Sequence, residues 1–514
     1  MKNILKIITN RLIIVGLALL LQLTWVVISM YKVSAYSNAV GILMVVLGIV
    51  VVMRIVSKND NPAYKLAWST LILAVPVFGV TLYLLFGRKN AQKSMRVKGD
   101  RIHKILQPEL TQDAEVFDRL LDADSSVAKQ SRYISSSTGF PVYQNTTAEY
   151  FPIGEAYFEA LKRELLAAKH FIFMEYFIVE CGEMWDSILD ILIQKAKEGV
   201  EVRFMYDDMG CIMILPSRYE EKLKAYGIET RVFNPFVPFL SMVMNNRDHR
   251  KIAVIDGHTG FTGGINLADE YINVKVVHGH WKDTGIMLKG EGVWSLTAMF
   301  LEMWNTVKAT DTDFIKYRPI RPEGAAFATD GFIQPYGDSP LDTECVGESV
   351  YLNIINRARR YVYIFTPYLI TDNEMVTALT LAAKSGVDVR IVTPHIPDKK
   401  FVFLLTRSYY PQLLKAGVRI MEYTPGFIHA KCFLCDDELG TVGTINMDYR
   451  SLYLHFECGV LMYRCQALEQ MKKDFMETFD ASTEITNEFC DATQIGRAHV
   501  RTPVTYADLV CRLL

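Results

Sequence analysis

Two stretches of this chain, HRKIAVID at residues 249–256 and HAKCFLCD at residues 429–436, share the pattern His-x-Lys, four further residues and Asp. Six residues then separate each Asp from a Gly, and an Asn (Asn266 or Asn446) lies three residues after that Gly. One such match is a weak signal, because exposed strands often alternate in this way. Two matches with identical spacing indicate two half-sites that meet to perform phosphate chemistry.

The residue types of the motif suit displacement at a phosphodiester without a metal ion or cofactor. One histidine can attack phosphorus as neutral imidazole, while the other, protonated, gives its proton to the leaving oxygen. Imidazole holds either state near neutral pH because its unperturbed pKa is about 6.5. Lysine and asparagine side chains can bind the non-bridging oxygens. The predicted site residues are His249, Lys251, Asp256, Asn266, His429, Lys431, Asp436 and Asn446.

The spacing also predicts which side chains share a face. Side chains two residues apart in a strand point to the same side, so each histidine is expected to project with its lysine. Arg250 and Ala430 are expected to face away. The apolar runs at residues 252–255 and 432–435 predict buried strands that each end at the Asp. The two cysteines of the second run are therefore predicted to be core thiols rather than zinc ligands.

The motifs close the two halves of an internal repeat. The junction AKEGVEVR at residues 196–203 parallels AKSGVDVR at residues 383–390. Periodicity predicts the same element order in both halves, helix, strand, helix, strand. The predicted elements are 155–168, 171–177, 185–197 and 200–206 in the first half, and 350–360, 362–365, 374–384 and 387–392 in the second. This order predicts a duplicated α/β fold whose sheets are covered on both faces, with one active site shared between the halves.

Composition limits the partners that this chain can have. Half of its 514 residues are hydrophobic, 22% are charged, and the formal net charge is −2. Nucleic-acid enzymes of this size more often carry a basic excess, so no nucleic-acid partner is predicted. Nine scattered cysteines argue against a disulfide framework. His278 and His280 lack an acidic or cysteine partner at metal-ligand spacing, and no metal site is predicted there.

Three apolar segments, at residues 12–31, 38–56 and 66–87, predict transmembrane helices near the N-terminus. About 20 apolar residues cross a bilayer, so the first and third are long enough and the second is marginal. A cleaved signal peptide is the alternative for the first segment, but no small-x-small cleavage site follows it. Six basic residues flank the segments on either side, which leaves the orientation open.

Changes in composition mark the other boundaries. A polar, weakly periodic stretch with one helical piece at about residues 111–121 reads as a linker, and a stretch rich in Pro, Gly and Asp reads as a connector. The last twenty residues or so resemble translated sequencing-adapter DNA, and we expect them not to be native. The predicted divisions are membrane segments at 1–89, a linker at 90–137, a first domain at 138–315, a connector at 316–340, a second domain at 341–494 and the tail at 495–514.

The doubled motif resembles that of the phospholipase D superfamily, and the chain from about residue 39 to 489 is similar to the bacterial cardiolipin synthase family within it. Further matching stretches are YLLFGR at 83–88, YDDMG at 206–210, HWKDT at 280–284 and NMDYRS at 446–451. The resemblance implies duplicated phospholipase D-like domains in a multi-pass protein of the bacterial cell membrane. It also implies condensation of two phosphatidylglycerol molecules into cardiolipin and glycerol.

The resemblance further implies roles for single residues. His249 would be the nucleophile that forms a phosphatidyl-histidine and His429 the acid–base group, although the reverse assignment stays open. The other implied roles are phosphate binding for Lys251, Lys431, Asn266 and Asn446, bracing for Asp256 and Asp436, and orientation of the histidines for Asp283 and Glu457. Departures from the family pattern are Gly264 and Thr444, where Ser is frequent, and His455, where Asn is usual.

Two other functions remain open on the sequence alone. Water in place of a lipid hydroxyl would make the protein a hydrolytic phospholipase D, and a nucleic-acid substrate would make it a membrane-tethered nuclease. The apolar segments favour lipid over nucleic acid. Nothing in the sequence decides the acceptor or the oligomeric state.

Overall fold

The computed structural model describes residues 20, 24, 28, 38–58, 61–86, 93–236, 245–320 and 327–492. The chain divides into two compact units, a smaller one that contains the residues up to Ser94 and a larger one made of Met95–Asn234 and Arg247–His499. The predicted tail lies outside the described residues. So does the first apolar segment, apart from Leu20, Thr24 and Ile28.

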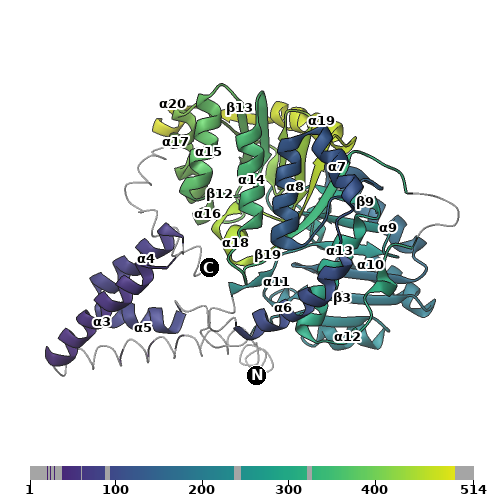
Figure 1. Ribbon diagram of the computed structural model, residues 1–514, viewed down its shortest axis with the longest axis horizontal. Helices are drawn as coiled ribbons and strands as arrows, with labels where there is room; N and C mark the ends of the chain where they lie inside the picture. Colours follow the sequence, from purple (N-terminus) through teal and green to yellow (C-terminus); the bar gives the residue numbers. More distant parts are fainter. Residues whose placement is uncertain are drawn as a thin grey trace. The chain divides into compact units, whose positions relative to one another are not determined.

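In the smaller unit, helices α3 (Asn38–Val56), α4 (Pro62–Ala74) and α5 (Pro76–Phe86) pack around Ile55, Ile72, Val80 and Tyr83 (Figure 1). The segment predicted as one span at residues 66–87 is therefore broken, because Pro76 cannot continue the hydrogen bonds of α4. Gly79 permits the tight α4–α5 packing, since a Cβ there would lie 2.5 Å from the Cα of Ile72.

The predicted transmembrane helices find no support in this unit. The eleven residues of α5 rise only about 16 Å, roughly half of the hydrocarbon thickness of a bilayer. Among the residues that the structure describes, no helix combines the length and the hydrophobicity that a membrane crossing requires. The multi-pass arrangement stays a prediction.

The first half of the larger unit is built on a seven-stranded mixed sheet. Its strands in spatial order are β1 (Thr146–Phe151), β9 (Gly285–Gly290), β7 (Thr259–Gly263), β6 (Ile252–Ile255), β2 (Phe171–Tyr176), β3 (Glu201–Asp207) and β4 (Glu229–Phe233). Strands β2, β3 and β4 are parallel, and the others run antiparallel to their neighbours. Helices α9 (Gly154–Ala167) and α10 (Glu183–Lys197) cover one face and α13 (Val293–Val307) the other.

The second half repeats this topology strand for strand. Its sheet has the spatial order β10 (Phe332–Asp338), β19 (His455–Tyr463), β17 (Leu439–Gly443), β16 (Cys432–Cys435), β11 (Tyr361–Phe365), β13 (Asp388–Pro394), β14 (Arg419–Tyr423) and β20 (Ser482–Ile485). Helix α19 (Ala467–Asp480) packs on one face, and α14 (Val346–Arg357) and α15 (Asn373–Lys384) pack on the other. The predicted α/β duplication is confirmed, with β20 as an addition of the second half.

Both faces of each sheet are covered, which explains the continuous apolar runs. In β2, Phe171 and Phe173 belong to the core under α13, while Ile172 and Met174 belong to the core under α9 and α10. The predicted strand and helix ranges agree with the observed ones to within a few residues. Both cysteines of β16 are fully buried, as predicted for core thiols.

The stretch predicted as a linker is largely helical. It forms α6 (Lys93–Leu106), α7 (Ala114–Ala123) and α8 (Ser125–Thr138), where the sequence predicted one helical piece. Asp113 and Asp124 cap α7 and α8 through their carboxylates. Helix α8 packs against α14 and β10, and Figure 1 shows it beside α14. Strand β10 in turn lies within the predicted connector, and its Pro335 is tolerated because β10 is an edge strand.

Two short parallel pairings join the halves. Strand β5 (Arg247–Asp248) of the first half pairs with the start of β19, so that Asp248 lies opposite Phe456. Strand β8 (His280–Lys282) of the first half pairs with β15 (Gly426–Ile428) of the second, so that Ile428 lies opposite Lys282. Each pairing ends one residue before a motif histidine, and this register positions the site.

Candidate active site

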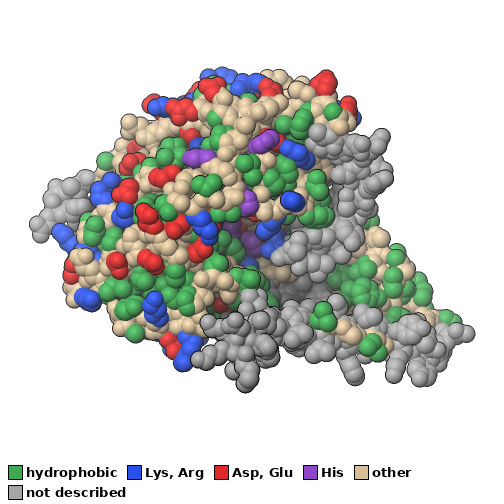
Figure 2. Space-filling model, turned by 180° about the vertical axis from the view of Figure 1, so that it is seen from behind, with side chains coloured by type: hydrophobic (Ala, Val, Ile, Leu, Met, Phe, Trp, Pro, Cys, Tyr) green, Lys and Arg blue, Asp and Glu red, His purple; other side chains and the backbone are tan. Residues whose placement is uncertain are grey.

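The two motif histidines enter the site from opposite halves, each directly after one of the inter-half pairings. The His249 backbone N–H donates to the Phe456 carbonyl at 3.0 Å, and the His429 N–H donates to the Lys282 carbonyl at 2.7 Å. The next residues in the same register, Glu457 and Asp283, therefore lie beside His249 and His429 respectively. Figure 2 shows histidine side chains near the middle of one face, next to Lys and Arg side chains.

Each histidine is held by a carboxylate from the other half. His249 Nδ1 lies 2.9 and 3.0 Å from the two carboxylate oxygens of Glu457, and His429 Nδ1 lies 2.6 Å from Asp283 Oδ2. When these carboxylates are ionised they only accept hydrogen bonds, so in that state Nδ1 carries the proton and Nε2 keeps the lone pair. Each Nε2 lies on the side of the ring opposite the carboxylate, where a substrate phosphate could bind.

The side chain of Glu457 is one methylene longer than that of Asp283. Two departures from the family pattern, Thr444 and Gly264, match this difference in length. Thr444 Oγ1 donates to Glu457 Oε2 and so helps to fix the longer side chain. Gly264 occupies the equivalent place in the first half, where a Cβ would lie 2.1 Å from Asp283 Oδ1. Glycine is therefore required beside Asp283, whereas Thr444 supplies a hydroxyl for Glu457.

The motif lysines lie on the same side as their histidines. Lys251 Nζ donates to the His249 carbonyl, and Lys431 Nζ donates to the His429 carbonyl. Burial lowers the pKa of Lys251 to about 7 and that of Lys431 to about 8. A bound phosphate would raise both values, because its negative charge stabilises the ammonium form. Arg250 faces away, as predicted, and pairs with Glu175 at 2.6 Å.

The empty site favours uncharged imidazole. Burial lowers the pKa of both His249 and His429 well below 6.5, and the positive charges of Lys251 and Lys431 lower both further. Each histidine is only 7% exposed. Burial also raises the pKa of Asp283 to about 7. Lys251 and Lys431 each lower the pKa of both histidines, so these four side chains lie close enough to form a single site.

The two asparagines differ in how they are held. Both polar atoms of Asn266 are hydrogen-bonded, since its Oδ1 accepts from the Ile178 N–H at 3.0 Å and its Nδ2 donates to the Tyr271 hydroxyl at 2.7 Å. The side-chain oxygen of Asn446 is buried and has no partner among the described residues. Of the two amides, that of Asn446 thus has the larger unused hydrogen-bonding capacity toward a ligand.

The motif aspartates lie at the far ends of their strands. Asp256 accepts from the backbone N–H groups of Lys169, His170 and Phe171 at 2.7–2.9 Å. Asp436 accepts in the same way from residues 359–361. At about 3.3 Å per residue, five residues put Asp256 roughly 16 Å from Lys251 along the strand. The geometry is that of a brace, the role implied by the resemblance, rather than of substrate contact.

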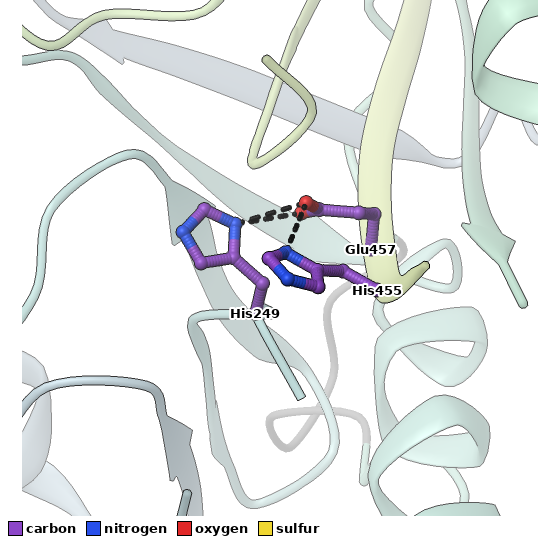
Figure 3. A group of neighbouring side chains, drawn as sticks. All are labelled: His249, His455 and Glu457. Atoms are coloured by element: carbon purple, nitrogen blue, oxygen red, sulfur yellow. Dashed lines mark hydrogen bonds and ion pairs between the residues drawn. The ribbon is translucent and has the colours of Figure 1, made fainter. Parts of the chain in front are cut away.

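Sequence reasoning did not assign a role to His455. Its ring centroid lies 5.4 Å from that of His249, and its Nδ1 lies 3.7 Å from Glu457 Oε1 (Figure 3). The only group among the described residues with a metal-compatible arrangement is His249, His455 and Glu457. His280 instead contacts the Tyr423 hydroxyl at 2.9 Å. The departure from Asn at position 455 was the one signal in the sequence that marked this residue.

A family model described as "Cardiolipin synthase, PLD-like domain" matches residues 161–289 and 351–479, and one described as "Phospholipase_D-nuclease N-terminal" matches residues 43–88. The doubled His-Lys site in a duplicated α/β fold thus defines a phospholipase D-like enzyme. The phosphatidylserine synthase of Haemophilus influenzae, with a TM-score of 0.53, 14% identity and coverage of 71% of this chain and 95% of its own, shares this fold.

Three bacterial relatives narrow the class of enzyme. A cardiolipin synthase of Halalkalibacterium halodurans is 34% identical over 89% of this chain and 90% of its own. Cardiolipin synthase 2 of Bacillus cereus is 36% identical over 87% of this chain and 86% of its own. An uncharacterised protein of Streptococcus mutans is 47% identical over 87% and 96%. The chain belongs to the cardiolipin synthase family and is a phosphatidyltransferase of the phospholipase D superfamily.

Proposed function

We propose that this enzyme condenses two phosphatidylglycerol molecules into cardiolipin and glycerol through a phosphatidyl-histidine intermediate. The observation that carries the proposal is the crossed arrangement in which each half orients the histidine of the other. Two imidazoles, each with its Nε2 opposite its carboxylate, and two lysines share one electrostatic site. This set provides a nucleophile, an acid–base group and positive charge for the equatorial oxygens.

In the first half-reaction, His249 Nε2 attacks phosphorus and the N–P bond forms. The negative charge of the bound phosphate raises the pKa of His429, which takes up a proton at Nε2 as the substrate binds. The P–O bond to the headgroup glycerol then breaks, and His429 gives this Nε2 proton to the leaving oxygen. Glu457 faces the opposite nitrogen of His249 with both oxygens, and its charge stabilises the imidazole as it becomes cationic. This contact supports His249 as the nucleophile.

In the second half-reaction, the glycerol hydroxyl of another phosphatidylglycerol replaces the lost glycerol. His429 takes the hydroxyl proton, the new P–O bond forms, and the N–P bond of His249 breaks. The site ends in its starting protonation state, so no co-reactant is needed. The near-complete burial of both imidazoles limits access by bulk water and favours a lipid hydroxyl over hydrolysis.

Product analysis tests the overall reaction. Purified full-length enzyme is incubated with phosphatidylglycerol alone, and the lipids and glycerol are quantified. Cardiolipin and glycerol in equal amounts are expected. Phosphatidic acid without cardiolipin would replace the proposal with a hydrolytic phospholipase D. Absence of turnover of lipid together with cleavage of nucleic acid would replace it with a nuclease.

A substrate with a good leaving group tests the histidine assignment. A phosphatidyl ester of p-nitrophenol needs no proton at its leaving oxygen, so loss of the acid should matter little for the first step. His429→Ala should therefore still release p-nitrophenolate and accumulate phosphorylated His249. His249→Ala should release none. The opposite pattern would reverse the roles of the two histidines.

We also propose that the enzyme is attached to the bacterial membrane through its smaller unit. Helix α3 exposes Ile42, Leu43, Val46, Val50 and Met53, and contiguous exposed apolar surface is typical of membrane contact. The full-length protein should stay with membranes during alkaline carbonate extraction. Lysine substitutions at Ile42, Val46 and Val50 should weaken retention, whereas three lysine substitutions on the exposed surface of the larger unit should not. Release of the wild-type protein would contradict the proposal.

A further inference from the structure

His455 lies in the site but has no role in the proposed reaction. It is 8% exposed, and neither of its ring nitrogens has a hydrogen-bond partner among the described residues. Buried polar atoms are nearly always paired, because leaving one unpaired costs free energy. Packing alone does not require histidine here. The equivalent position in the other half is Trp281, whose ring lies 5.5 Å from that of His429.

His455 shares Glu457 with His249. Glu457 Oε1 lies 2.9 Å from His249 Nδ1 and 3.7 Å from His455 Nδ1. Figure 3 shows the Glu457 carboxylate in contact with both rings. One ligand atom from each of the three residues lies within 4.8 Å of the other two. Zinc bonds of about 2.0–2.1 Å in tetrahedral geometry separate ligand atoms by roughly 3.3 Å, so small side-chain shifts would suffice. Two histidines and one carboxylate form a known zinc donor set that leaves a fourth position open.

We propose that His249, His455 and Glu457 form a binding site for a divalent transition metal ion of the zinc class, and that this ion inhibits the enzyme. Zinc would bind His249 at Nδ1, the nitrogen that faces Glu457, and the proton on this nitrogen would be released to solvent. It would withdraw electron density from the ring and occupy the carboxylate that supports the nucleophile. The inhibitory effect rests on the proposed role of His249, whereas metal binding does not.

The position of the ion predicts the type of inhibition. The substrate phosphate is expected at Nε2 of His249, on the opposite side of the ring from the metal. Zinc should therefore lower kcat and leave KM for phosphatidylglycerol nearly unchanged. The charges of Lys251 and Lys431 oppose a second cation, so the ion should be exchangeable and removable by a chelator.

Metal binding is tested directly on the full-length, detergent-solubilised enzyme. Equilibrium dialysis against Zn²⁺ should give one bound ion per chain, and Co²⁺ should give the visible absorption of a nitrogen- and oxygen-ligated site. His455→Phe and His455→Asn should lose both signals while their thermal unfolding stays cooperative. His258→Phe, which removes a histidine elsewhere, should keep them. No binding of Zn²⁺ by the wild type in the dialysis, or equal binding by both His455 variants, would overturn the proposal.

Inhibition is tested separately, with each variant compared with its own metal-free rate. Wild-type turnover should fall by tenfold or more with Zn²⁺ and recover with chelator, while His455→Phe should change less than twofold. Equal inhibition of both proteins would mean that zinc acts through the lipid headgroups, and would overturn the inhibitory role. If zinc binds but no cardiolipin forms in its absence, the proposed reaction fails while the metal site stands.

Discussion

At the scale of single residues, the site depends on two carboxylates that reach across from the opposite half. Glu457 and Asp283 each keep the proton of their histidine on Nδ1 and so direct the Nε2 lone pair to the substrate. They also supply negative charge that stabilises an imidazolium. Neither residue belongs to the repeated motif, yet each decides what its histidine can do.

Removal of either carboxylate charge should slow catalysis but should not weaken substrate binding. Glu457→Gln and Asp283→Asn keep the size and a hydrogen-bond acceptor, so the histidines stay in place but their cationic forms lose support. We expect each change to lower kcat by roughly 10²-fold or more, with KM changed only slightly. Steady-state kinetics with phosphatidylglycerol measures both constants.

The matched control is Glu422→Gln, which makes the same change in a buried carboxylate that lies 3.0 Å from His395 Nδ1. Any effect of that variant should be on stability rather than on kcat of the folded enzyme. Wild-type kcat in either site variant would show that the crossed pairs do not support the reaction.

Phosphate binding should be coupled to proton uptake. At pH 8 the empty site holds Lys251, with a pKa of about 7, mostly uncharged. A bound phosphodiester raises that pKa, so binding should take up on the order of one proton at pH 8. Calorimetry with bis(glyceryl) phosphate in two buffers of different ionisation enthalpy measures this number.

The control for proton uptake is Lys251→Arg, which keeps the positive charge but stays protonated at every accessible pH. The variant should take up clearly fewer protons than the wild type, and the remainder should come from Lys431 and the histidines. Equal uptake by both proteins would mean that Lys251 is already charged in the empty enzyme.

At the scale of elements, strand register places the chemistry. The motif histidines and lysines lie in extended segments just before β6 and β16, and the inter-half pairings of β5 and β8 set their partners. Asp207 anchors β5, because its carboxylate accepts from Arg247 at 2.7 Å and from the Asp248 N–H at 3.0 Å. A shift of one residue in either pairing would turn each histidine away from its carboxylate.

The sequence predicted the repeated elements well, because buried strands such as β2 and amphipathic helices such as α10 carry strong local periodicity. It also pointed to Asp283 and Glu457, but only through resemblance. The crossing of the pairs was not predictable, since β5 and β8 are two and three residues long and meet partners more than 140 positions away. Helices α6 and α8 were missed because charged and hydroxyl residues hide their narrow apolar stripes.

The bracing aspartates should affect stability rather than catalysis. Asp256→Ala removes the acceptor of three backbone N–H groups in a buried turn, and should lower the free energy of unfolding by about 2–4 kcal/mol. Asp436→Ala should cost less, because its turn is more exposed and water can replace the carboxylate. Thermal unfolding ranks the two, and KM should stay unchanged in both. A variant that folds normally but has lost turnover would instead assign that aspartate to the reaction.

At the scale of the larger unit, one hydrophobic core joins the two sheets. It includes Phe173 and Leu288 of the first half together with Phe365 and Phe475 of the second. Helix α13 of the first half contacts β10 of the second, and α19 of the second contacts β1 of the first. Neither half could be separated without exposing this core. The same surface that aligns the crossed histidine pairs therefore also links the stability of the two halves.

The two halves should accordingly unfold in one cooperative transition. The chain provides independent probes, because Trp185, Trp281, Trp294 and Trp304 lie in the first half and no tryptophan lies in the second. Buried thiols in the second half, Cys432 and Cys458, become reactive only on unfolding. With Trp25 and Trp68 replaced by Phe, urea titration followed by fluorescence should coincide with thiol labelling of the second half measured by mass spectrometry.

The buried thiol of Cys211 is the internal control for that comparison. It is measured by the same labelling reaction as the second-half thiols, but it reports the unfolding of the first half. The urea dependence of Cys211 labelling should coincide with that of tryptophan fluorescence, whether or not the second half unfolds at the same urea concentration. If the second-half thiols react at a lower urea concentration than Cys211, the halves unfold independently and the shared core does not couple them. Coincident curves would mean that the active site is lost with the first disruption of either half, because each histidine depends on a carboxylate that the other half must hold in register.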